Sequence, residues 1–69
     1  MRSQLFDLQL ELDYAREHLQ QARIALARAQ WEDASPSLVE ARRQAVRKYT
    51  AYVQRVQDEY AAALRQNSA

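Results

Sequence analysis

The sequence predicts an all-α protein, a two-helix antiparallel coiled-coil hairpin that pairs into a four-helix-bundle dimer. Glycine is absent and proline occurs once, at Pro36, which disfavours β-hairpins because their tight turns need positive φ angles. In each half of the chain, apolar residues recur at alternating steps of three and four, the spacing of a coiled-coil seam. With 69 residues, the chain has room for one domain, a single hairpin over 1–69.

The first helix is expected over about residues 3–32. Its intervening residues are mostly Gln, Glu, Arg and Ala, which favour helix. Its apolar residues keep one heptad register without a break, which predicts a continuous seam. One seam position holds Leu5, Leu12, Leu19 and Leu26, and the next holds Leu8, Ala15, Ala22 and Ala29.

A short loop is expected over about residues 33–36. Ser35 is one candidate N-cap, because it would place Pro36 at the first helical position, where the missing N–H costs nothing. Ser37 is the other, because Ser37 and Glu40 have the spacing of a capping box. The two alternatives differ by two residues, and the sequence alone leaves both open.

The second helix is expected over about residues 37–66. Folding the chain about Ala34 makes every seam position of one helix face a seam position of the other, for example Leu12 and Val56, or Leu19 and Tyr49. Arg42 is the polar exception, and we expect its stem to pack on the seam while its guanidinium reaches water. The seam positions are Val39, Val46, Val53 and Tyr60, followed by Arg42, Tyr49, Val56 and Ala63.

Further apolar residues lie outside this seam, and a two-helix core of this size is thin. Burial against a second copy would give a four-helix bundle. Burial against another helical protein is the alternative, and single exposed apolar residues also occur without function. The predicted partner interface consists of Phe6, Leu10, Ile24, Trp31, Leu38 and Tyr52.

The net charge of +1 is divided unevenly, with −2 in residues 1–34 and +3 in residues 35–69. We expect the two halves to attract each other, or the same halves of a second copy. Cations near Tyr49 and Tyr52 in the second helix make a nucleic-acid-binding dimer the alternative function. Helical spacing divides these cations between two flanks, so solvated surface is the other explanation. The cations are Arg43, Arg47, Lys48 and Arg55.

The sequence offers no group of residues for catalysis. Cysteine is absent and His18 is the one histidine, without a second ligand at helical metal-site spacing, so we expect a solvated or hydrogen-bonded side chain beside the seam. The carboxylate pairs Asp7/Glu11 and Asp13/Glu17 could hold a cation, although solvated surface explains them far better. We expect no enzyme, no cofactor, no metal and no small-molecule substrate.

Apolar runs fall short of the roughly 20 residues that span a bilayer, and the N-terminus does not resemble a signal peptide. We therefore expect a cytoplasmic protein without a membrane partner, and the Arg- and Ala-rich composition indicates a bacterial or phage source. The predicted function is protein–protein interaction, as an adaptor, chaperone-like or regulatory protein. The expected partner is a second copy or another helical protein.

Overall fold

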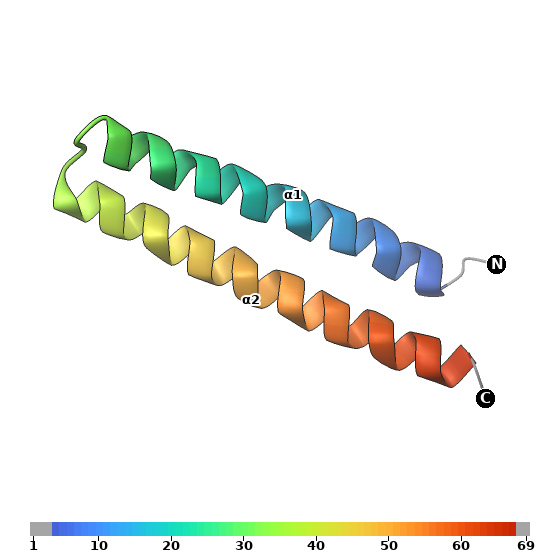
Figure 1. Ribbon diagram of the computed structural model, residues 1–69. Helices are drawn as coiled ribbons and strands as arrows, with labels where there is room; N and C mark the ends of the chain where they lie inside the picture. Colours follow the sequence, from blue (N-terminus) through green and yellow to red (C-terminus); the bar gives the residue numbers. More distant parts are fainter. Residues whose placement is uncertain (1–3, 68–69) are drawn as a thin grey trace.

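The computed structural model describes residues 4–67, which form two antiparallel helices packed side by side, α1 (Gln4–Trp31) and α2 (Pro36–Asn67) (Figure 1). The molecule is a rod with extents of 52, 16 and 14 Å. The predicted helical hairpin is confirmed. Helix α1 ends one residue before the expected end, and α2 extends one residue beyond each expected end. The expected start of the first helix, at residue 3, lies outside the described residues.

Helix α1 ends in a Schellman motif. The N–H of Ala34 donates to the carbonyl of Ala29 at 2.9 Å, and the N–H of Asp33 donates to the carbonyl of Gln30 at 3.3 Å. This geometry requires a left-handed residue between helix and loop, usually glycine. Asp33 takes that position with φ of 53°, and aspartate is among the few other residues that tolerate it. The chain therefore reverses direction without glycine.

Helix α2 begins with Ser35 as its N-cap. The Ser35 hydroxyl accepts a hydrogen bond from the N–H of Leu38 at 3.3 Å, and the Ser35 carbonyl accepts one from the N–H of Val39 at 3.0 Å. Pro36 is thus the first helical residue, where its fixed φ suits the helix. The alternative cap at Ser37 is wrong, because Ser37 already lies inside the helix.

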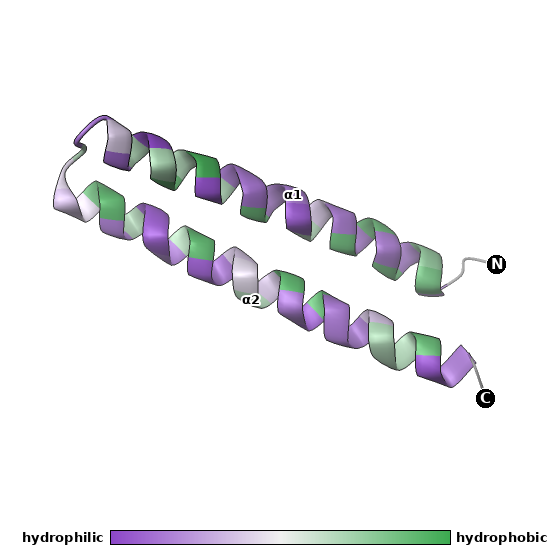
Figure 2. Cartoon of the chain, in the orientation of Figure 1, coloured by the Kyte–Doolittle hydropathy of each residue, from purple (hydrophilic) through white to green (hydrophobic). Residues whose placement is uncertain are grey.

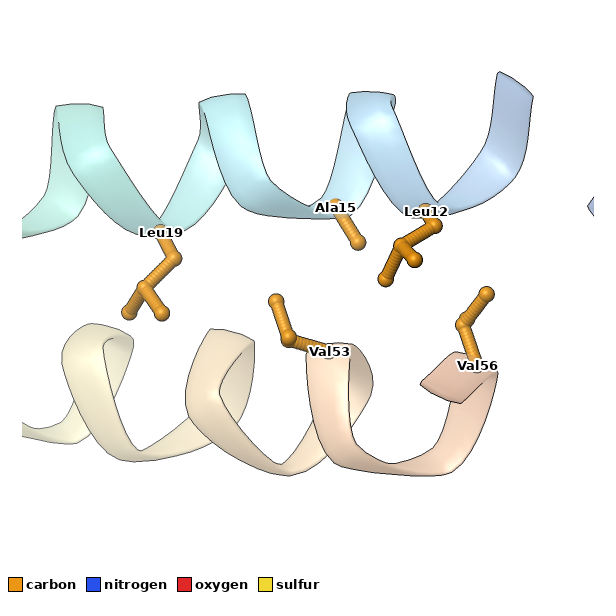
Figure 3. Packing of buried hydrophobic residues seen from close by; sticks show 5 residues of the cluster. All are labelled: Leu12, Ala15, Leu19, Val53 and Val56. Atoms are coloured by element: carbon orange, nitrogen blue, oxygen red, sulfur yellow. The ribbon is translucent and has the colours of Figure 1, made fainter. Parts of the chain in front are cut away.

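The core lies between the two helices and consists of seam residues. Figure 3 shows Leu12 and Val56 pointing toward one another, and Val53 reaching toward Ala15 from the opposite helix. Half-buried Tyr49 packs against this cluster, which also contains Leu19. These neighbours are the ones expected when the chain folds about Ala34. The buried residues are Leu8, Leu12, Ala15, Leu19, Ala22, Ala29, Val53, Val56 and Ala63.

The core becomes thinner toward the loop. Val39 and Val46 of α2 are only half-buried, and Arg42 is exposed. The facing α1 residues at this end include Ala22 and Ala29, whose methyl groups fill little space. Hydrophobic residues are interleaved with hydrophilic ones along both helices (Figure 2). The loop end is therefore the part of the hairpin with the least apolar packing of its own.

Candidate functional site

Large apolar side chains remain exposed on the hairpin. Trp31, at the end of α1, is the most exposed of them, at 89%. Five of the six predicted interface residues are exposed and the sixth, Tyr52, is half-buried. The sequence prediction did not single out Leu64, which is also exposed. The exposed large apolar residues are Phe6, Leu10, Tyr14, Ile24, Trp31, Leu38 and Leu64.

A groove of about 300 Å³ near the loop joins two of the predicted interface residues. Ile24 of α1 and Leu38 of α2 both line it, and Arg28, Glu32 and Arg42 add charged groups. The groove lies where the core is thinnest, because the small seam residue Ala29 forms part of its lining. It combines apolar and charged lining in the way that interfaces between proteins often do.

A cluster of aromatic rings joins the two helices on one side of the seam. The ring of His18 lies 4.3 Å from that of Tyr14 in an edge-to-face arrangement, and 5.3 Å from that of Tyr49 in a stacked one. The hydroxyl of Tyr52 donates to Oε1 of Glu11 at 3.3 Å across the helices. His18 is thus a half-buried ring between two tyrosines. Sequence analysis missed this cluster. The spacing of four residues between Tyr14 and His18 could have indicated their contact on α1, but not the contact with Tyr49 of α2.

Tyr52 is the one described residue with a clearly shifted pKa. Removal from water raises the pKa of its phenol above the ordinary value of 10.0, and the negative charge of Glu11 with the hydrogen bond between them raises it further. Both effects disfavour the phenolate. Tyr52 therefore remains a hydrogen-bond donor to Glu11 throughout the neutral pH range.

A second groove, of about 450 Å³, lies along α2 beside this cluster. Tyr49, Ala51 and Tyr52 line it together with two cations. Nζ of Lys48 lies 5.5 Å from the ring centre of Tyr49, and the guanidinium carbon of Arg55 lies 5.1 Å from that of Tyr52. Both distances permit cation–π attraction. The groove therefore presents positive charge beside aromatic surface.

The structure separates the four basic residues that the sequence singled out in the second helix. Lys48 and Arg55 share the groove just described. Arg47 instead forms an ion pair with Glu40 at 2.9 Å, and Arg55 approaches Glu59 at 3.9 Å. Arg43 directly follows the seam position Arg42. Helical spacing therefore places it on the flank of the seam opposite to the groove that Lys48 and Arg55 share. No single stripe of these four cations exists, as their helical spacing indicated.

The hairpin thus has two different sides flanking its seam. The tyrosine side is defined by the residues whose contacts and grooves place them together: Glu11, Tyr14, His18, Ile24, Arg28, Glu32, Leu38, Arg42, Lys48, Tyr49, Tyr52 and Arg55. The arginine side is opposite and is defined by Arg16, Arg23 and Arg43, which occupy the heptad position on the other flank of each helix. Sequence analysis of the second helix alone missed Arg16 and Arg23.

Within residues 4–67, no group of three or more His, Cys, Asp and Glu side chains is arranged to hold a metal ion. Neither α1 nor α2 combines the length and apolar character that crossing a membrane requires. Comparison of the chain with protein-family models, with curated proteins and with solved structures finds no match. Function must therefore be argued from the surface of the hairpin itself.

Proposed function

We propose that the protein acts by protein–protein interaction, without catalysis, and that its tyrosine side binds a second copy to form a four-helix bundle. The observation that carries this proposal is the amount of surface the single chain exposes. That surface is 5426 Å², whereas a compact monomer of the same mass exposes about 4,500 Å². The excess is close to the roughly 800 Å² that each partner buries in a stable interface.

The tyrosine side supports the proposal by its apolar content. Both grooves lie there, and both contain apolar side chains of α2, namely Leu38 in one and Tyr52 in the other. Ile24 and Leu38 line the same groove where the core is thinnest. A second hairpin laid on this side would cover residues that the seam leaves exposed, as in four-helix bundles.

The charges of the tyrosine side favour a second copy as the occupant. There α1 contributes two carboxylates, Glu11 and Glu32, against one cation, Arg28. Helix α2 contributes the cations of Arg42, Lys48 and Arg55. A two-fold axis can lay α1 of one hairpin over α2 of the other, so that opposite charges meet in both halves of the interface. In this proposal Phe6 and Trp31 lie at the edge of the contact. A cytoplasmic adaptor or regulator of bacterial or phage origin fits this construction.

The test replaces two groove residues by aspartate. The variant Ile24→Asp/Leu38→Asp is expected to weaken the dimer about 100-fold, because each copy would bury two unpaired carboxylates. The matched control Gln20→Asp/Gln44→Asp adds the same charge at two exposed positions outside the grooves and is expected to dimerise as the wild type does. Sedimentation equilibrium measures the mass, and circular dichroism measures helicity.

Two results would contradict the proposal. One is a wild-type mass that stays at the 8.1 kDa of the single chain as the protein concentration rises to the millimolar range. The other is dissociation of the control pair while the groove pair stays associated, which would move the interface away from the tyrosine side. The wild-type concentration series needs no substitution and decides the question even if the groove variant unfolds.

A further inference from the structure

The arginine side of the hairpin carries three exposed guanidinium groups, those of Arg16, Arg23 and Arg43. We propose that this side binds the sugar–phosphate backbone of a nucleic acid. The proposal concerns the side opposite to the tyrosine side, so it does not depend on self-association. It also differs from the prediction based on the second helix, because two of its three arginines belong to α1.

The fold brings these arginines from distant parts of the chain onto one surface. Arg16 and Arg23 each lie four residues after a seam leucine, Leu12 and Leu19, and so share one flank of α1 at a spacing of about 10 Å. Arg43 has the same relation to Val39 in α2. Folding about Ala34 places it opposite residue 25, within about 3 Å of Arg23 along the axis.

Among residues 4–67, these three arginines form no ion pair with an acidic residue, whereas Arg47 and Arg55 of α2 are paired with Glu40 and Glu59. Asp13 lies three residues before Arg16, and its carboxylate accepts a hydrogen bond from Gln9 at 3.1 Å. The register places Arg23 and Arg43 at nearly the same level on this flank of the seam, and like charges repel each other. An anion bound between them would replace that repulsion by attraction.

The neighbours of the arginines favour phosphate over an acidic protein. Gln20, Gln30 and Thr50 are exposed uncharged polar residues around them, and no large apolar side chain lies among the three. Two carboxylates also lie on this flank, but Asp13 accepts a hydrogen bond from Gln9 and Glu40 is paired with Arg47. Interfaces between proteins bury aromatic and apolar groups at their centre, whereas contacts with a nucleic-acid backbone are mainly polar. Arginine also binds phosphate oxygens through two parallel hydrogen bonds. The surface therefore has the chemistry of a backbone contact.

The experiment measures binding of a fluorescent 20-base-pair duplex, as DNA and as RNA, by anisotropy at increasing salt. Three phosphate contacts predict a slope of log K against log salt of about −2.7 for each hairpin. The variant Arg16→Gln/Arg23→Gln/Arg43→Gln is expected to bind at least about tenfold more weakly and to lose most of the slope. The control Arg28→Gln/Lys48→Gln/Arg55→Gln removes the same charge from the tyrosine side. It is expected to keep the wild-type affinity and the wild-type salt slope. Circular dichroism confirms that each variant is folded.

Three results would overturn this proposal. The first is no retention of either duplex by the wild type at low salt. The second is an equal loss of affinity in both triple variants, which would mean that only net charge matters. The third is equal or tighter binding of polyglutamate, which would assign the surface to an acidic protein. Tighter binding of one duplex than of the other would show whether DNA or RNA supplies the phosphates. It would support the same arginine site in either case.

Discussion

Replacing Leu12 with alanine is expected to lower the free energy of unfolding by about 3 kcal/mol, the middle of the range for buried leucines. Leu12 is 5% exposed and belongs to the central cluster with Leu19 and Val56. Within residues 4–67 the two helices share one apolar layer, and four of its nine buried residues are alanine. A cavity at this position therefore removes a large share of the packing that holds the helices together.

Leu10→Ala is the matched control, because it makes the same substitution two residues away in the same helix. Leu10 is 53% exposed, and we expect a change below about 0.5 kcal/mol. Urea unfolding followed by circular dichroism measures both variants, at one protein concentration because association also contributes to stability. Equal losses in the two variants would mean that the buried side of α1 has been assigned to the wrong residues.

Replacing Val56 with aspartate is expected to be more damaging, at about 4 kcal/mol near neutral pH. Val56 is the largest fully buried side chain of the described chain, so a carboxylate there would lose its hydration with no partner. Val56→Thr keeps the volume and adds only a hydroxyl, and we expect a loss of about 1–2 kcal/mol from it. Urea unfolding of the two variants separates the effect of charge from that of polarity.

The Val56→Asp variant also has a predicted pH dependence. Burial raises the pKa of the introduced carboxyl in the folded state, so the folded state holds its proton more tightly than the unfolded state does. The stability deficit relative to wild type should therefore shrink as pH falls from about 7 to about 4. A deficit that stays constant or grows over this range would show that the carboxyl reaches water, and hence that position 56 is not enclosed.

The helical hairpin was predictable because its seam is repeated many times along the chain. Every buried residue occupies a predicted seam position, since a heptad pattern of leucine, alanine and valine has only one face to bury. Ser35 was recognisable as a cap from its type and from the proline after it. The left-handed residue at Asp33 was not predicted, because glycine, the usual signal, is absent and aspartate has many other uses.

The surface was less predictable because it depends on both helices at once. The ring stack of Tyr14, His18 and Tyr49 requires side chains from residues far apart in sequence. The arginine side likewise combines Arg16 and Arg23 of α1 with Arg43 of α2. Scanning the second helix alone found its cations but not the ion pairs that Arg47 and Arg55 form with Glu40 and Glu59. Comparing flank positions across the predicted register would have found the arginine side.

The central claim is the register in which α1 and α2 face each other when the chain folds about Ala34. Because the chain contains no cysteine, pairs of introduced cysteines report this register directly. The account predicts that Ala15→Cys/Val53→Cys forms an intramolecular disulfide on mild oxidation. Ala15→Cys/Val46→Cys, displaced by about 10 Å along the axis, is predicted to remain reduced. Preferential crosslinking of the displaced pair within single chains, detected by mass spectrometry, would contradict the account.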